Sequence, residues 1–251
     1  MFRIDCTFAA AFLLTLAHPA SAAEIKVLSA NALSLAAKPL GEAFTRETGH
    51  DLVFVFGSPG QVNDRLKAGE VYDLVILPTE AAAAVEQEGK WRPGTRHPLA
   101  RVGIGIAVRE GVKVDLSTIG STRKALLEAR TITLSDSRTG GLSGPNAQKV
   151  LAKLGIADTV KDKLVLSGNG QVLIATGDVD IGLYNVSEIP RAKGVVLAGP
   201  VPPAVQVYIN YDAAVPATNA APDDALALVR YFSRRSARPK WEQVGLELAG
   251  E

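Results

Sequence analysis

Three turns of small polar residues are the segments of this sequence best suited to bind a ligand. Each follows a short apolar run and precedes a stretch of helical periodicity: Ser29–Asn31, Gly57–Gly60 and Asp136–Gly144. The first turn of a helix has unpaired N–H groups and a partial positive charge, so it can hold an anion without a formal cation. In an open α/β sheet such turns share the carboxyl edge, where ligands bind. The pattern predicts an anion site.

Helix capping is the alternative role for each turn, because Ser, Asn and Gly are common cap residues. Three such turns in one chain favour a shared site, provided that the fold brings them together. Nucleotide binding has little support. Gly57–Gly60 is not followed by Lys-Ser or Lys-Thr, and Gly140–Gly144 does not match the dinucleotide fingerprint.

The candidate ligand-binding side chains are hydroxyls and amides, with one cation. The planar guanidinium of Arg138 suits a carboxylate, although a solvated loop arginine is the alternative. Tyr184 and Asn185 end a later apolar run, and packing of the Tyr184 ring is the alternative there. The expected ligand-binding set is Ser29, Asn31, Ser58, Arg138, Thr139, Ser143, Tyr184 and Asn185.

Cysteine and histidine usage excludes several kinds of site. Cys6 is the one cysteine, and it lies in a segment that we expect to be removed, which excludes disulfides and thiolate catalysis in the remaining chain. His50 and His97 have no second ligand candidate within a few residues, so a zinc site has no support, and we expect both at the surface. We therefore expect neither a metal nor a cofactor.

The first 22 residues have the pattern of a signal peptide. Arg3 precedes an apolar run from Phe8 to Ala17, and small residues follow at Ala20–Ala22. The apolar run is too short for a membrane-spanning helix, which needs about 20 residues. We predict cleavage before Ala23, export to the periplasm and no membrane span in the mature chain.

Composition bounds the class of protein. The chain has 251 residues, of which 47% are hydrophobic and 21% charged, so it can bury a core and is not disordered. Lys and Arg number 27 against 26 Asp and Glu, and the two signs are interspersed. No basic region is concentrated enough to bind a polyanion, so we expect no nucleic-acid partner.

Apolar runs that alternate with helical periodicity predict an α/β fold. Most expected strands are apolar on both faces, as in parallel sheets covered by helices. The expected strands are Ile25–Leu28, Leu52–Phe56, Leu74–Leu77, Val102–Val108, Thr131–Leu134, Leu164–Leu166, Ile181–Tyr184, Val195–Leu197 and Val205–Asn210. The expected helices are Leu33–Thr48, Val62–Ala68, Glu80–Glu88, Arg123–Glu128, Asn146–Leu154, Gln171–Thr176 and Asp223–Ser233.

Two regions are expected to carry the chain between two lobes, one around Pro98–Gly103 and one at Gly199–Pro203. Two crossings make the first lobe discontinuous. We predict lobe 1 from residues 23–102 plus 205–251 and lobe 2 from residues 103–204, after a signal peptide of residues 1–22.

Several motifs, in their order along the chain, resemble a known family. They are Phe44–Gly49, Phe56–Gly60, Tyr72–Val75, Lys149–Ile156 and Thr176–Gly182. From Ile25 to about Leu248 the chain resembles the periplasmic molybdate-binding-like family of solute-binding proteins. The resemblance implies a type II periplasmic binding fold: two lobes, each with a mostly parallel sheet flanked by helices, joined by a two-stranded hinge. It also implies a monomer that closes over a small anion and delivers it to an inner-membrane ABC permease.

The chain departs from that family at ligand positions. Pro59 stands where molybdate binders tend to have a second serine, and Asn185 precedes Ser187-Glu188 where they have a tyrosine before Ser-Asp. The loop Thr139–Gly144, and Gly199–Pro202 with Gln206, resemble a divergent branch similar to periplasmic aconitate isomerase. That resemblance implies a tricarboxylate ligand, with Arg138 as its partner.

Two functions follow from these observations. The favoured one is a solute-binding protein for an oxyanion or an organic polycarboxylate. The alternative is an isomerase that shifts an allylic proton on an unsaturated tricarboxylate, which needs a base within reach of the carbon acid. Tyr184 and Asp136 are the candidates for that base.

Overall fold

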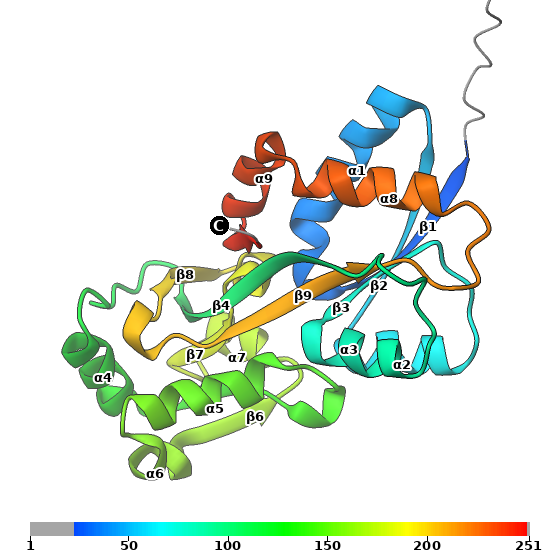
Figure 1. Cartoon of the computed structure of the whole chain (residues 1–251). Helices are drawn as coiled ribbons and strands as arrows, with labels where there is room; N and C mark the ends of the chain where they lie inside the picture. Colours follow the sequence, from blue (N-terminus) through cyan, green and yellow to red (C-terminus); the bar gives the residue numbers. More distant parts are fainter. Residues whose placement is uncertain (1–22, 250–251) are drawn as a thin grey trace, which may run out of the picture.

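The strands of both lobes join in one hydrogen-bonded path. The computed structural model describes residues 23–249, so the predicted signal peptide lies outside the described residues. The strand order is β2-β1-β3-β9-β4-β7-β5-β6, and β8 and β10 also pair with β4. Figure 1 shows β4 and β9 side by side between two groups of helices. The predicted two-lobed α/β fold is confirmed.

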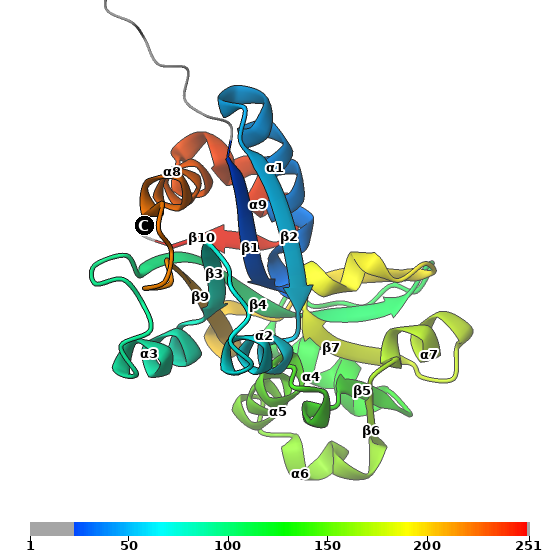
Figure 2. The ribbon, with the colours of Figure 1, turned by 90° about the vertical axis from the view of Figure 1, so that its right-hand side faces the viewer.

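The first lobe comes from both ends of the described chain. Its elements are β1 (Glu24–Ala30), the short helix η1 (Asn31–Leu33), α1 (Ser34–Thr48), β2 (Asp51–Gly57), α2 (Pro59–Lys67), β3 (Leu74–Pro78), α3 (Thr79–Gln87), β9 (Tyr208–Ala214), α8 (Pro222–Ser233), α9 (Arg238–Glu242) and β10 (Leu246–Leu248). Strands β1, β2 and β3 are parallel, and helices cover both of their faces (Figure 2). Val27 packs with α1 and α8, whereas Leu28 packs with α2 and α3. Burial on both faces explains the continuous apolar runs.

The second lobe has the same construction. Its elements are α4 (Ile119–Glu128), β5 (Ile132–Ser135), the short helix η2 (Ser137–Thr139), α5 (Ser143–Lys153), α6 (Ala157–Val160), β6 (Leu164–Ser167), α7 (Gly170–Thr176), β7 (Ile181–Asn185), the short helix η4 (Val186–Arg191), β8 (Val195–Pro200) and the short helix η5 (Pro203–Val205). Strands β5, β6 and β7 are parallel. Leu183 packs in the cluster that contains α5 residues, and Tyr184 in the one that contains Ile174 of α7.

Strand β4 (His97–Arg109) belongs to both lobes. Its residues His97–Gly103 pair with β9 of the first lobe, and Ile104–Val108 pair with β7 of the second. The crossing expected around Pro98–Gly103 is therefore an unbroken strand, and Pro98 lies within it rather than in a loop. The chain returns through η5 and the two residues that precede β9.

Other differences from the predicted elements have local causes. Strand β9 begins at Tyr208 instead of Val205, because Val205 ends η5 and the Gln206 side chain takes hydrogen bonds that a strand would make. Helices α6 and α9 and strand β10 are three to five residues long, too short for periodicity to reveal. His50, expected at the surface, is partly covered. Its side chain is 12% exposed and stacks on Phe44.

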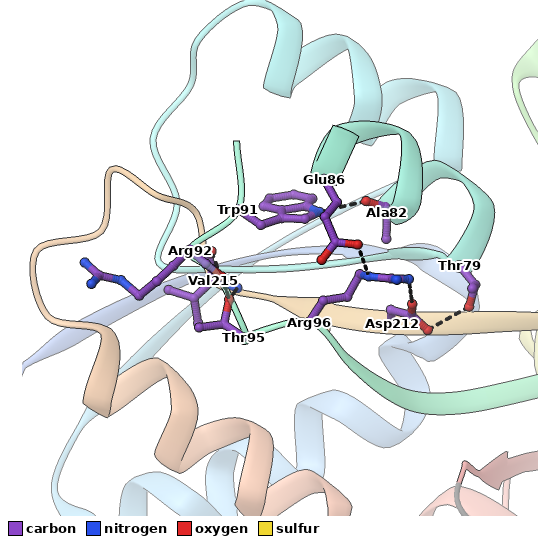
Figure 3. Close-up of polar contacts among 9 residues, drawn as sticks. All are labelled: Thr79, Ala82, Glu86, Trp91, Arg92, Thr95, Arg96, Asp212 and Val215. Carbon is purple, nitrogen blue, oxygen red and sulfur yellow. Dashed lines mark hydrogen bonds and ion pairs between the residues drawn. The ribbon is translucent and has the colours of Figure 1, made fainter. Parts of the chain in front are cut away.

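A polar cluster fastens α3 and the start of β4 to β9 (Figure 3). The Asp212 carboxylate, 3% exposed, accepts hydrogen bonds from Arg96 Nη1 at 2.7 Å and Thr79 Oγ1 at 2.7 Å. Arg96 Nε also lies 2.9 Å from Glu86 Oε2. The buried Trp91 donates its indole N–H to the Ala82 carbonyl, so it is a packing residue. This cluster links α3 and the residue before β4 to the buried carboxylate of β9.

Candidate functional site

The three polar turns meet where the lobes approach each other. Ser29 pairs in register with Phe56, which brings the carboxyl ends of β1 and β2 together. The Gly60 N–H, in the first turn of α2, donates to the Gly140 carbonyl of the second lobe at 3.2 Å. The turns at residues 29–31, 57–60 and 136–144 are therefore neighbours, as a shared site requires.

A pocket of about 510 Å³ lies beside these turns. Asn31 contributes from the first lobe, and hydroxyls, amides and one carboxylate come from the second. The lining residues are Asn31, Ser135, Ser167, Gly168, Asn169, Gly170, Gln171, Val172, Tyr184, Glu188 and Ala192. Most of the wall is formed by the carboxyl ends of β5, β6 and β7 and by the start of α7.

The start of α5 is pressed against the end of β5. Ser143, 3% exposed, shares a hydrogen bond of 2.7 Å with the hydroxyl of the pocket residue Ser135. A Cβ atom at Gly144 would lie 2.0 Å from the Ser135 carbonyl oxygen, so the approach requires glycine. The N-terminus of α5, with its N–H groups and positive dipole end, thus adjoins the pocket.

The start of α7 approaches Tyr184 equally closely. A Cβ at Gly170 would lie 2.1 Å from the Tyr184 hydroxyl and 2.2 Å from Thr133 Oγ1. Those two hydroxyls are 3.1 Å apart and hydrogen-bonded. Burial raises the pKa of Tyr184 to about 12. The phenol therefore stays protonated at neutral pH and can donate a hydrogen bond to an anion.

Ser58 is a helix cap and also lies at the junction of the lobes. Its hydroxyl accepts from the Gln61 N–H at 3.3 Å, and Gln61 Oε1 accepts from the Ser58 N–H, which completes a capping box. A Cβ on Gly140 would lie 3.2 Å from this hydroxyl. A hydroxyl that accepts a cap bond still has its own hydrogen to donate. Capping and ligand binding are therefore compatible at Ser58.

The turn of the second lobe holds its own ion pair. Arg138 binds the Asp136 carboxylate, with Nη2 2.6 Å from Oδ2. The hydrogen bonds from Arg138 hold the pKa of Asp136 below its usual range. The Arg138 side chain is 87% exposed, and neither residue lines the pocket. Thr139 ends η2 in the same turn.

Two further predicted residues are buried next to the pocket walls. Ser29 is fully buried, and its hydroxyl donates to the Ala30 carbonyl at 3.3 Å. Asn185 is 3% exposed, and its Oδ1 has no hydrogen-bond partner among the described residues. The same holds for Ser187 Oγ. Neither Ser29 nor Asn185 lines the pocket of Tyr184.

Sequence reasoning missed part of the pocket wall: Ser135, Ser167, Asn169, Gln171 and Glu188. One signal could have revealed several of these residues. Ser167–Gly170 is a fourth turn between a strand and a helix, with the same small polar composition as the turns at residues 29–31, 57–60 and 136–144. Gln171 is held by a hydrogen bond from its Nε2 to the Glu188 carbonyl at 3.3 Å.

Within residues 23–249, no group of three or more His, Cys, Asp or Glu side chains could hold a metal ion. In the same range, no helix has the length and hydropathy needed to cross a membrane. Among the described residues, the pocket wall offers hydroxyls, amides, the start of α7 and the carboxylate of Glu188.

Comparison with known proteins places this geometry among solute-binding proteins. The profile of a bacterial extracellular solute-binding protein family matches residues 25–247. The chain is 25% identical to an aconitate isomerase from Pseudomonas sp. over 98% of both chains. It is 29% identical to a molybdate-binding protein from Rhodobacter capsulatus, over 74% of this chain and 73% of that protein. The substrate-binding domain of a putative molybdenum ABC transporter from Clostridium difficile has a similar fold, with a TM-score of 0.75, 18% identity, and coverage of 91% and 100% of the two chains.

Proposed function

Because this chain belongs to the bacterial extracellular solute-binding proteins, we propose that it captures a small anion between its lobes for an ABC-type importer. We further propose that it works in the periplasm as a monomer after removal of residues 1–22. Closure of the lobes would follow from better contacts between the anion and the closed state than the open state.

The observation that carries this proposal is the arrangement of donors around the pocket. Helix α7 begins at its wall, α5 begins behind the lining residue Ser135, and Tyr184 stays protonated beside them. Glycines at positions 144 and 170 allow both helix starts to approach closely. Helix N-termini and neutral donors favour an anion without the cost of desolvating a cation.

The size of the pocket favours an organic polycarboxylate over a single oxyanion. About 510 Å³ is in the range of pockets that enclose organic ligands. The proposed ligand set is Asn31, Ser58, Ser143 and Tyr184 at the junction of the lobes, with Ser29, Arg138, Thr139 and Asn185 as the remaining candidates from the sequence. Arg138 bonds Asp136 through Nε and Nη2, and its five N–H donors leave capacity for a bound carboxylate.

Isomerisation of an unsaturated tricarboxylate is the second candidate, because the similarity to an aconitate isomerase extends over 98% of both chains. The pKa shifts argue against the two candidate bases, Tyr184 and Asp136. A general base works best with a pKa near the working pH. The pKa of Tyr184 is raised to about 12, and the pKa of Asp136 is lowered by Arg138. Neither group is tuned to remove a proton from carbon at neutral pH.

Thermal melting against molybdate, sulfate, citrate and trans-aconitate tests the proposal. An anion at 100 times its dissociation constant should stabilise the fold by about 2.7 kcal/mol. Tyr184→Phe should raise the dissociation constant of whichever anion binds by about ten-fold, since it removes one hydrogen-bond donor to a charged group. Tyr208→Phe, outside this pocket, is the matched control. If none of the four anions shifts the melt, the proposal is wrong for these ligand classes, and proton NMR of trans-aconitate reports turnover separately.

A further inference from the structure

The side-chain amide of Gln206 lies between the two strands that connect the lobes. Gln206 is 7% exposed. Its Oε1 accepts from the Ile104 N–H at 2.7 Å and from the Val207 N–H at 2.9 Å. Its Nε2 donates to the Ile104 carbonyl at 2.9 Å. One side chain thus bonds both main-chain groups of Ile104.

This amide replaces the next rung of the β4–β9 ladder. Gly103 pairs with Tyr208, so continued antiparallel pairing would set Ile104 opposite Val207. The Gln206 amide instead bonds Ile104 on one side and Val207 on the other. The direct pairing of the two strands ends here, and no main-chain group of Ile104 loses its partner.

Three contacts fix Gln206 to the second lobe. Ile104, which it bonds, pairs with Asn185 of β7. Its Nε2 lies 3.4 Å from the Val201 carbonyl, and its own carbonyl accepts from Lys153 Nζ at 2.8 Å. Lys153 ends α5, the helix whose first residue is Ser143 in the candidate site. Helix α5 therefore joins the site to the crossing of the strands.

Gly103 gives the amide its space. A Cβ atom at this position would lie 2.8 Å from both Cδ and Nε2 of Gln206. Gly103 is also the last residue of β4 paired with β9. As a glycine, it has more backbone freedom than other residues. It also lies at the end of the β4–β9 pairing, where a bend breaks the fewest hydrogen bonds.

From these contacts we propose that Gln206 is the positioning residue of the hinge: it fixes both crossing strands to the second lobe, so that bending is confined to Gly103 and Val207. The boundary between the lobes then lies between residues 103 and 104 and between residues 206 and 208. This inference assumes that the lobes close, as the proposed function states, but it does not depend on which anion binds.

The test compares Gln206→Ala, Gly103→Ala and the double variant in the ligand-free protein. Dye pairs on cysteines introduced at the exposed positions Lys67 and Lys161, with Cys6 replaced by Ser, report the inter-lobe distance by single-molecule FRET. Hydrogen exchange reports the amides of Ile104 and Val207. Gln148→Ala, an exposed glutamine of α5, is the matched control.

We expect Gln206→Ala to speed exchange at both amides by at least about ten-fold and to broaden the FRET distribution. Gly103→Ala should do the same, because its Cβ displaces the amide. In the double variant, Gly103→Ala should add little to the exchange rates and FRET width of Gln206→Ala, since the amide that its Cβ would displace is already absent. Gln148→Ala should match the wild type.

Additive effects of the two substitutions would overturn the proposal, as would an unchanged FRET distribution and exchange in folded Gln206→Ala. If Gln206→Ala does not fold, Gly103→Ala and Lys153→Met decide: both must broaden the distribution. A role in stability alone would lower the melting temperature and leave the distribution unchanged. The readout needs no ligand, so failure of the four anions to bind leaves this test intact.

Discussion

Arg96 neutralises the buried carboxylate of Asp212 beside the crossing strand. Replacing Arg96 by Leu should destabilise the protein by about 3 kcal/mol, because Asp212 would keep, among the described residues, only Thr79 as a side-chain partner. The double variant Arg96→Leu with Asp212→Asn should recover part of that loss, since no charge stays buried. Urea unfolding measures both. Equal losses in the two variants would contradict a charge-pairing role.

At the scale of residues, the sequence indicated the turns better than the side chains within them. Asn31 and Tyr184 were selected and line the pocket, and Ser143 reaches it through Ser135. The pairing of Arg138 with Asp136, two residues away, depends on rotamers that no sequence pattern specifies. The burial of Ser29 and Asn185 depends on which face of each strand meets a helix, and this is decided by tertiary packing.

Glu47 at the end of α1 is held by two groups of the α8 region. Tyr231 donates to its carboxylate, and both terminal nitrogens of Arg234 lie 3.0 Å from it. The hydrogen bonds from Arg234 and Tyr231 lower the pKa of Glu47 from 4.5 to about 2. A lowered pKa contributes stability above the unfolded value, and that contribution is lost as pH falls from about 4.5 towards 2.

Glu47→Gln should therefore reduce the fall in melting temperature between pH 5 and pH 2.5. The comparison with Glu80→Gln, an exposed carboxylate of α3, isolates the effect of the α1–α8 contact. Melting curves measured at half-unit pH steps provide the check. The same acid dependence in Glu47→Gln and the wild type would contradict the assignment.

At the start of α5, close contact with the end of β5 positions the helix. Gly144→Ala should destabilise the protein by about 2 kcal/mol, because the new methyl group meets the Ser135 carbonyl at 2.0 Å. Gly120→Ala is the matched control at the second residue of α4. Its nearest neighbour, Thr118 Oγ1, is 3.7 Å away, so a gain of up to about 0.5 kcal/mol is expected. Chemical denaturation of both variants tests the contrast.

At the scale of elements, periodicity was sufficient for the strands and longer helices. The run from Val102 to Val108 predicted the centre of β4, but not its extension back to His97 through Pro98. Prolines usually interrupt strands, and here the register shifts between Pro98 and Ala100, which accommodates the proline at an irregularity. Such an irregularity depends on the partner strand, which local sequence does not encode.

Gly140 is one point of contact between the lobes. Its φ of 75° lies in the left-handed region, and a Cβ would lie 3.1 Å from Gly60 Cα across the junction. Gly140→Ala should cost about 1 kcal/mol in backbone strain and also weaken anion binding roughly five-fold, because it hinders closure. Gly111→Ala has a comparable φ of 86° with nothing within 4 Å, so it should lose stability alone. Calorimetric titration with the bound anion separates the two. Equal affinities would contradict a role of this contact in closure.

At the scale of the molecule, the alternation of apolar runs with helical periodicity predicted the α/β class, and the order of motifs, with two expected crossings, predicted two lobes. The two-lobed α/β fold is confirmed. The residues at which the chain passes from one lobe to the other stay a prediction. In our proposal they depend on the Gln206 side chain, which bonds Ile104, 102 residues away along the chain, in place of main-chain groups. Patterns of hydropathy carry no information about such a substitution.

Strand β4 contributes to the cores of both lobes without a break. In proteins whose halves are joined by a tether, an extra residue in the connection only lengthens it. One residue inserted between Gly103 and Ile104 would instead turn every following side chain of β4 to the opposite side, so that Ile104 and Ile106 would leave the α5 cluster that they now fill. Insertions can therefore be accepted in the surface turns of this molecule, whereas a single-residue insertion within β4 would reverse the faces on which its later side chains lie.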